Sequence, residues 1–269
     1  MAGLSLRRVL LTGSNRGIGL ELVKQLLGKS NPPQWVFATC QDPEGARGQL
    51  DGLGLNLVIN NAGIFCNLSL AMVDSREMLG AYKTNVVGPM LVGQTPPVWC
   101  SALFNVDTSR LRACSLRVLP QLCRSLTQQT PREPPMTTDS DKAFLPLLKK
   151  AAQGSSQNGL SCSKAAIVNI SSFMGSIDRV PETFSVPAIS YRCSKAALNM
   201  LTRCQAPSYA EDGILCTAVH PGWVKTDMGT QEAHLPVDES VRGILAVLPT
   251  LSEKHSGSLW SWTGKTIPW

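Results

Sequence analysis

The sequence contains 269 residues with a formal net charge of +6. That length fits one large α/β domain, expected over residues 1–269, with a sizeable core. No block of about five like charges and no run of about 18 apolar residues occurs, which argues against nucleic-acid partners and against a membrane partner. The nine cysteines and three histidines are scattered without metal-ligand spacing. We therefore expect reduced thiols, a cytoplasmic location and no metal site.

A glycine-rich turn lies between the first expected strand, Arg8–Leu11, and the first expected helix, whose apolar residues recur at helical spacing from Leu20 to Leu27. The turn reads Thr-Gly-Ser-Asn-Arg-Gly-Ile-Gly over residues 12–19. Glycine permits the tight turn and lets the backbone approach a pyrophosphate, while the helix N-terminus offers free N–H groups to phosphate. We expect a bound dinucleotide here; the alternative is a glycine-rich loop with no ligand. The residues expected to contact the dinucleotide are Gly13, Ser14, Asn15, Arg16, Gly17, Ile18 and Gly19.

The end of the second expected strand, Trp35–Cys40, bears on which nicotinamide cofactor binds. An acidic residue there would hold the ribose hydroxyls of NAD, but the end of this strand carries Thr39, Cys40 and Gln41, and no acid follows until Asp42. Arg16 lies in the glycine-rich turn, where a guanidinium can pair with a 2′-phosphate. Both observations favour NADPH over NADH. Against them, Gln41 stands where a second basic residue is expected, and Arg16 has the alternative interpretation of a solvated loop charge.

Too few residues separate this strand from the next apolar run. A doubly wound sheet needs a third strand and its helix there, which takes roughly 30 residues. Only residues 41–54 separate the second expected strand from the apolar run Leu55–Ile59. These residues contain neither a β-branched run nor apolar residues at helical spacing. We therefore expect the third strand and its helix to be absent and the second strand to form an exposed edge. The adenine pocket would then lose a wall.

An irregular insertion is expected over residues 95–142. A buried helix should begin at Asn85 and continue over Ala143–Lys150, but the intervening stretch contains two proline pairs, which stop helices and favour extended chain. We expect the insertion to be disordered, apart from one short helix within residues 111–126. One interpretation is a lid or partner-binding loop; the other is an alternative exon or a gene-model error.

Tyr191 and Lys195 are four residues apart on an expected helix, so their side chains share one face. A nearby ammonium lowers the pKa of a phenol, which is ordinarily about 10, and Tyr191 would then exchange a proton with an alcohol or carbonyl oxygen. Alone, the pair also fits an ordinary exposed helix face. Ser172 follows the apolar run that ends at Ile170, and its neighbour Ser171 is expected to be a strand-end hydrogen-bonding residue.

In their order along the chain, these motifs resemble those of the short-chain dehydrogenase/reductase family. The glycine-rich turn looks like the family's cofactor loop. Further matches are Asn60–Gly63, Lys83–Gly88 with its helix asparagine Asn85, and His220–Thr226. Within the family, the chain is most similar to the carbonyl-reductase-like branch that includes the Sniffer and C-factor proteins. The resemblance implies a Rossmann-type doubly wound parallel sheet, here lacking its third strand and with an insertion in the helix after strand four.

The resemblance implies NADPH-dependent reduction of a carbonyl to an alcohol. Tyr191 would donate the proton, and Lys195 would lower its pKa and hold the nicotinamide ribose. Ser172 would hydrogen-bond the substrate oxygen, and Asn85 would hold a water that relays protons to Lys195. Further cofactor contacts are implied for Asn61, Ala62, Gly63, Tyr191, Lys195, Pro221, Gly222, Val224 and Thr226. The implied partner is a small carbonyl substrate. A homodimer is also implied, but the insertion interrupts the helix that would form it.

A second interpretation rests on the missing strand and the interrupted helix. The chain would then be a splice or gene-model variant with impaired cofactor binding, and would act as a non-catalytic interaction protein or have no stable function. Tight NADPH binding would exclude this interpretation.

Overall fold

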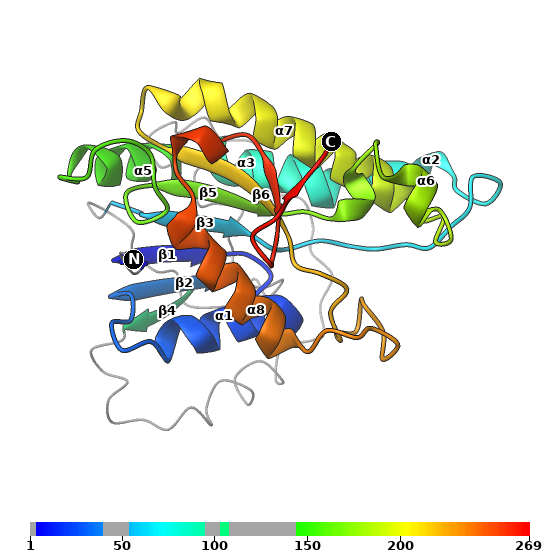
Figure 1. Cartoon of the computed structure of the whole chain (residues 1–269), viewed down its shortest axis with the longest axis horizontal. Helices are drawn as coiled ribbons and strands as arrows, with labels where there is room; N and C mark the ends of the chain where they lie inside the picture. The colour runs from blue at the N-terminus through cyan, green and yellow to red at the C-terminus, as the bar shows by residue number, and fades with distance from the viewer. Residues whose placement is uncertain (1–3, 40–53, 95–102, 108–143) are drawn as a thin grey trace, which may run out of the picture.

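Figure 1 shows the chain in a computed structural model, which describes residues 4–39, 54–94, 103–107 and 144–269. Within these ranges, eight strands form one sheet in the order β4-β2-β1-β3-β5-β6-β7-β8. The strands are β1 (Arg8–Leu11), β2 (Trp35–Thr39), β3 (Leu57–Asn60), β4 (Leu103–Asp107), β5 (Ala166–Ile170), β6 (Leu215–His220), β7 (Leu259–Ser261) and β8 (Thr266–Ile267). Neighbours from β2 to β7 pair in parallel, whereas β4 and β8 pair antiparallel at the two ends of the sheet. The expected Rossmann-type α/β sheet is confirmed.

Helices cover both faces of the sheet (Figure 1). The helices α1 (Gly17–Leu27) and α8 (Val237–Val247) pack on one face, and α5 (Phe144–Gln153) and α7 (Ile189–Ala210) pack on the other. Successive strand residues point to opposite faces, so Val9 lies in the core under α1 and α8 while Leu10 lies in the core under α5 and α7. Strands buried on both faces read as continuous apolar runs, which is why the sequence identified β1, β3 and β5.

The strand β4 corrects the expected edge of the sheet. It comes from the segment expected to be irregular, and it pairs antiparallel with β2, with Val106 opposite Val36. The strand β2 is therefore not an exposed edge, and β4 takes the place beside it that a third parallel strand would occupy. Strand pairing depends on tertiary context more than on local sequence, so the sequence did not reveal this partner. Residues 40–53, 95–102 and 108–143, which include the expected deficit and the expected helix within 111–126, lie outside the described residues.

The expected helix around Asn85 consists of three successive parts. It begins at α2 (Ser75–Tyr82), where the side chain of Asp74 accepts a hydrogen bond from the backbone of Glu77 at 2.8 Å and caps the helix. A π-helical turn, η1 (Lys83–Val87), follows and carries Asn85. The third part is α3 (Gly88–Gln94).

The remaining helices are short: α6 (Val180–Thr183) and the 3₁₀ turns η5 (Phe173–Gly175), η6 (Leu248–Thr250) and η7 (Glu253–His255). The helix α5 is separate from α3 and contacts it. Among the described residues, no helix has both the length and the apolar character to cross a membrane.

Candidate active site

The predicted site residues follow the carboxyl ends of parallel strands. Because β1, β3, β5 and β6 run in the same direction, the segments after them meet at one edge of the sheet, where ligands bind in open α/β folds. The glycine-rich turn follows β1, Asn61 to Gly63 follow β3, and Ser172 follows β5. Pro221 to Thr226 follow β6. The fold therefore brings together four segments that lie far apart in the sequence.

The glycine-rich turn is packed too closely for side chains at two of its glycines. Gly13 has a φ of +65°, and a Cβ there would lie 2.9 Å from Ala62 Cα. A Cβ on Gly19 would lie 2.1 Å from the carbonyl oxygen of Gly13. The Asn61 amide reinforces this contact by donating to the carbonyls of Thr12 and Gly13 at 3.1 and 2.9 Å. Asn61 and Ala62 thus support the turn from the neighbouring strand.

The start of α1 is suited to bind phosphate. Its N-cap residue, Arg16, is extended and makes no side-chain capping hydrogen bond, and the first turn contains no acidic residue. Uncapped N–H groups and the positive end of the helix dipole favour an anion. The side chains of Ser14 and Ile18 point elsewhere: Ser14 Oγ donates to the Thr39 carbonyl at 2.8 Å, and Ile18 packs against the core. Any contact of these two residues with a cofactor is left to their backbone.

Tyr191 and Lys195 lie one turn apart in the first part of α7, as their spacing predicted. The ammonium nitrogen of Lys195 is 5.6 Å from the centroid of the Tyr191 ring and donates to the Ile170 carbonyl at 2.7 Å. Ser172 is buried beside them, and its Oγ accepts a hydrogen bond from the backbone of Met174 at 3.1 Å. Ser171 instead contacts Asn199 Oδ1 at 2.6 Å, so its interpretation as a strand-end hydrogen-bonding residue is confirmed.

Asn85 is fully buried and links the π-helical turn to the active-site helix. Its Oδ1 accepts from the Ile64 backbone at 2.8 Å, while its Nδ2 donates to the Ile64 carbonyl at 3.0 Å and to Ser194 Oγ at 2.9 Å. Ser194 Oγ in turn donates to the Tyr191 carbonyl at 2.7 Å. Single-turn π-helices often occur at functional sites. Ser194 is a site residue that the sequence analysis did not identify, although it lies between Tyr191 and Lys195.

Burial sets the protonation states of the site. Burial raises the pKa of Tyr191 to about 12, although a hydrogen bond with Ser172 opposes the shift. Burial lowers the pKa of Lys195 to about 8. At neutral pH the phenol is therefore neutral and the ammonium predominantly charged. We expected Lys195 to lower the pKa of Tyr191, but burial dominates and the pKa is raised.

His220 is a second site residue that the sequence analysis did not single out. Its ring lies edge-on to that of Phe173 with centroids 4.7 Å apart, next to Ser172, and its Nδ1 is buried without a partner among the described residues. Burial, with a smaller contribution from the charge of Lys195, lowers its pKa to about 3. The imidazole is therefore neutral at physiological pH. Its position as the first residue of the family match His220–Thr226 was the available signal.

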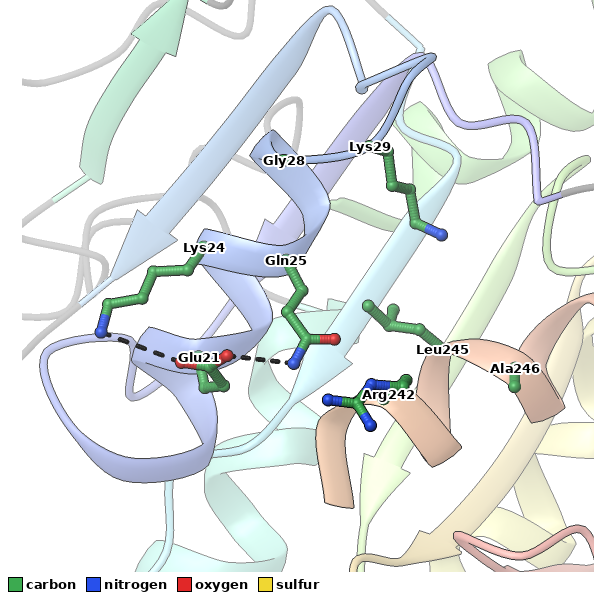
Figure 2. Close-up of a pocket in the computed structure, with 8 residues that line it drawn as sticks. All are labelled: Glu21, Lys24, Gln25, Gly28, Lys29, Arg242, Leu245 and Ala246. Carbon is green, nitrogen blue, oxygen red and sulfur yellow. Dashed lines mark hydrogen bonds and ion pairs between the residues drawn. The ribbon is translucent and has the colours of Figure 1, made fainter. Parts of the chain in front are cut away.

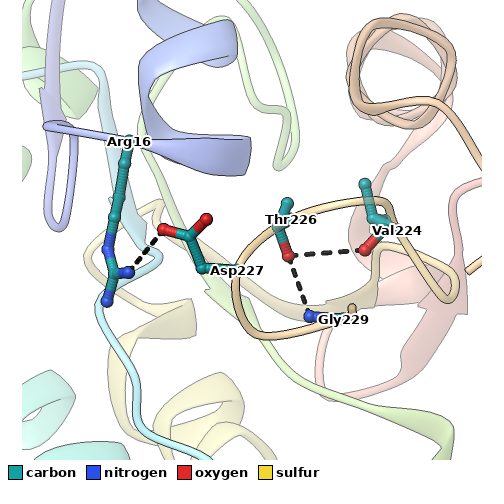
Figure 3. A network of polar contacts seen from close by, with 5 residues as sticks. All are labelled: Arg16, Val224, Thr226, Asp227 and Gly229. Atoms are coloured by element: carbon teal, nitrogen blue, oxygen red, sulfur yellow. Dashed lines mark hydrogen bonds and ion pairs between the residues drawn. The ribbon is translucent and has the colours of Figure 1, made fainter. Parts of the chain in front are cut away.

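The loop after β6 approaches the glycine-rich turn. Gly222 has a φ of +90°, and a Cβ there would lie 2.4 Å from Leu235 Cδ2. Thr226 Oγ1 donates to the Val224 carbonyl at 3.3 Å and accepts from the Gly229 backbone at 3.1 Å, as Figure 3 shows. Pro221 is held at the start of the loop, where its carbonyl accepts a hydrogen bond from Ser240 Oγ at 2.6 Å. The segment Pro221–Thr226 is thus part of a turn with its own internal hydrogen bonds.

A surface groove between α1 and α8 lies apart from these residues. It is lined by Glu21, Lys24, Gln25, Gly28, Lys29, Arg242, Leu245 and Ala246. Figure 2 shows Glu21 contacting both Lys24, at 3.8 Å, and Gln25, at 3.0 Å. Arg242 pairs with Asp238 at 3.0 Å. A binding site usually combines an apolar lining with a few convergent polar groups, whereas most of the residues that line this groove are charged or polar. We therefore do not assign the chemistry to this groove.

In the described part of the chain, no three His, Cys, Asp or Glu side chains gather as a metal site would require.

Comparison with known proteins identifies the family. Residues 147–235 match the family model of the short chain dehydrogenases. A short chain dehydrogenase of Penicillium aethiopicum is 31% identical over 224 residues, which cover 82% of this chain and 76% of that protein. An NADPH-bound carbonyl reductase from chicken fatty liver has a similar structure, with a TM-score of 0.73 and 41% identity over 99% of this chain and 100% of that one. The carbonyl reductase Sniffer of D. melanogaster also has a TM-score of 0.73, with 28% identity over 98% of this chain and 100% of that one. The chain therefore belongs to the short-chain dehydrogenase family.

Proposed function

We propose that this chain reduces the carbonyl group of a small molecule to an alcohol with NADPH, and that Tyr191 donates the proton. The observation that carries the proposal is the placement of Tyr191, Lys195, Ser172 and Asn85 at the edge of the sheet where the glycine-rich turn also lies. A similar solved structure is an NADPH-bound carbonyl reductase. Family membership supports an NAD(P)-dependent oxidoreductase, the carbonyl substrate is inferred from the likeness to carbonyl reductases, and the individual roles are inferred from the site.

The glycine-rich turn and the uncapped start of α1 fit a dinucleotide. Gly13 and Gly17 adopt positive φ values of +65° and +53°, and a Cβ on Gly19 would lie 2.1 Å from the Gly13 carbonyl oxygen, so the tight turn requires glycine at these positions. The backbone from Gly13 to Gly19 would hold the pyrophosphate, and Arg16 would hold a 2′-phosphate. The remaining residues proposed to line the cofactor are Asn61, Ala62, Gly63, Tyr191, Lys195, Pro221, Gly222, Val224 and Thr226. Bound NADPH supplies a hydride to the carbonyl carbon.

Tyr191 is in the protonation state that reduction requires. With a pKa raised to about 12 it keeps its proton at neutral pH, so it can donate to the oxygen on which negative charge develops. The neighbouring hydroxyl of Ser172 can hydrogen-bond the same oxygen and stabilise that charge. The proton donor and the oxyanion stabiliser thus come from α7 and from the end of β5.

Lys195 stabilises the phenolate that remains after proton donation. The ammonium lies 5.6 Å from the ring centroid of Tyr191, and its positive charge favours the ionised phenol over the neutral one. Asn85 would hold the water that returns a proton through Lys195. Both amide hydrogens of Asn85 are already used, but its Oδ1 accepts only the Ile64 N–H among the described residues and keeps a second lone pair.

The test is NADPH oxidation by the purified full-length chain with quinones and α-diketones as reactive carbonyl substrates. We expect NADPH consumption with the wild-type chain and a loss of about 10² to 10⁴ in kcat for Tyr191→Phe, the usual contribution of a general acid. Tyr82→Phe is the matched control, because Tyr82 is exposed on α2. Turnover by Tyr191→Phe at the wild-type rate would contradict the assigned role, and no oxidation by the wild-type chain with any of these carbonyls would contradict the activity.

A further inference from the structure

An exposed ion pair joins the glycine-rich turn to the loop after β6. Arg16 Nη1 lies 2.7 Å from Asp227 Oδ2, and Figure 3 shows the Arg16 side chain extending from the start of α1 to this carboxylate. Arg16 is the residue that both the sequence and the proposed function assign to the 2′-phosphate of NADPH. In this structure, that guanidinium is already occupied by a carboxylate from the opposite loop.

The two backbones that carry the pair are fixed close together. Gly17 follows Arg16 with a φ of +53°, and a Cβ on it would lie 3.2 Å from Thr226 Cγ2. Thr226 directly precedes Asp227, and its Oγ1 is held by the Gly229 N–H at 3.1 Å. The glycine-rich turn and the loop after β6 are thus held close to each other. Arg16 can therefore exchange Asp227 for another anion by side-chain movement alone.

The pair is open to exchange with another anion. The side chains of Arg16 and Asp227 are 69% and 77% exposed, and ion pairs this exposed are weak because water screens them. A 2′-phosphate carries about two negative charges and forms paired hydrogen bonds with a guanidinium. The 2′-phosphate would therefore compete with this single carboxylate for the Arg16 guanidinium.

We propose that Asp227 is a specificity-determining residue for the cofactor, because its carboxylate competes with the 2′-phosphate of NADPH for Arg16. The inference rests on the proposed function, since it presumes that NADPH binds at the glycine-rich turn. Asp227 weakens NADPH binding by up to the free energy of the Arg16–Asp227 pair that the phosphate displaces. NADH has no 2′-phosphate, leaves the pair intact and is unaffected, so Asp227 narrows the preference for NADPH over NADH.

The experiment measures dissociation constants for NADPH and NADH by fluorescence titration of the full-length chain at low ionic strength. For Asp227→Asn we expect NADPH binding to tighten by about two- to fivefold, the usual worth of an exposed pair, while NADH binding stays within experimental error. Added salt screens the pair and shrinks the gain. Glu232→Gln is the matched control, because it removes the same charge from the same loop and leaves the Arg16–Asp227 contact in place.

A double-mutant cycle tests whether Asp227 acts through Arg16. With Arg16→Met as the background, the competition no longer exists, so Asp227→Asn should leave the NADPH dissociation constant unchanged. A gain of the same size in that background would indicate direct repulsion of the phosphate and overturn the inference. The inference also fails if Asp227→Asn and wild type discriminate equally between NADPH and NADH. Binding of neither cofactor by the wild-type chain would overturn the proposed function as well.

Discussion

Substitution of Gly19 by alanine tests the packing of the glycine-rich turn directly. A Cβ at this position would lie 2.1 Å from the Gly13 carbonyl oxygen and 2.6 Å from Asn61 Nδ2. The first of these atoms is backbone and cannot rotate away. The turn must therefore shift away from α1, and the hydrogen bonds that Asn61 makes to the carbonyls of Thr12 and Gly13 are broken or lengthened.

The expected loss of stability follows from three contributions. Overpacking a filled site costs about 1–3 kcal/mol. Losing the two Asn61 hydrogen bonds costs about 1 kcal/mol each. Because alanine favours a helix over glycine, Gly19→Ala regains about 1 kcal/mol in the first turn of α1. The net decrease in the free energy of unfolding is about 3 kcal/mol, and NADPH affinity should fall with it because the displaced backbone is the proposed pyrophosphate site.

Urea denaturation followed by circular dichroism measures the change, with NADPH titration on the same samples. Gly80→Ala is the matched control: Gly80 lies inside α2, and a Cβ there meets no atom within 4 Å. We expect this control to gain about 0.5–1 kcal/mol from helix propensity and to bind NADPH as wild type does. If Gly19→Ala were as stable as Gly80→Ala and bound NADPH equally well, the close packing of the turn would be refuted.

Three further predictions concern protonation in the site. Because reduction needs a charged Lys195 with a pKa of about 8, kcat for carbonyl reduction should be constant at lower pH and fall as pH rises through that value. Lys195→Met should be slow without this inflection. Gly63→Ala should lower kcat more strongly than it raises the NADPH dissociation constant, because its Cβ would lie 3.2 Å from Asn85 Oδ1, where the relay water is proposed; an unchanged kcat would contradict that water. Folding lowers the pKa of His220 from 6.5 to about 3. As pH falls below 6.5, His220 therefore takes up a proton in the unfolded chain but not in the folded chain, and the free energy of unfolding decreases. At pH 5 the loss is about 2 kcal/mol, and His220→Asn should remove that part of the pH dependence in urea denaturation.

Much of the site was predictable because, in this fold, a residue that directly follows a parallel strand lies at a known edge of the sheet. Once β1, β3, β5 and β6 are recognised as buried parallel strands, the residues that follow them must meet at one edge of the sheet. The helical period predicted that Tyr191 and Lys195 share one face of a helix, and the other motifs in their order along the chain were needed to interpret the pair as part of a site. The strand identities were equally accessible, because strands buried on both faces leave continuous apolar runs.

The contacts that depend on distant partners were not predictable. The strand β4 pairs with β2 across more than sixty intervening residues, and nothing local in Leu103–Asp107 specifies that partner. The π-helical turn that carries Asn85, and the hydrogen bond from Asn85 to Ser194, also require two elements to pack. The ion pair of Arg16 with Asp227 joins two residues that lie far apart in the sequence. The sequence therefore did not reveal that Arg16 has a carboxylate partner.

Binding of NADPH to this chain, measured by fluorescence titration, decides whether its cofactor site is functional. It separates an active reductase from a variant whose cofactor site is impaired. The structure predicts saturable binding that is tighter for NADPH than for NADH and is weakened by Gly19→Ala but not by Gly80→Ala. The absence of saturable NADPH binding, with the chain shown to be folded by circular dichroism, would contradict the proposed NADPH-dependent reductase activity.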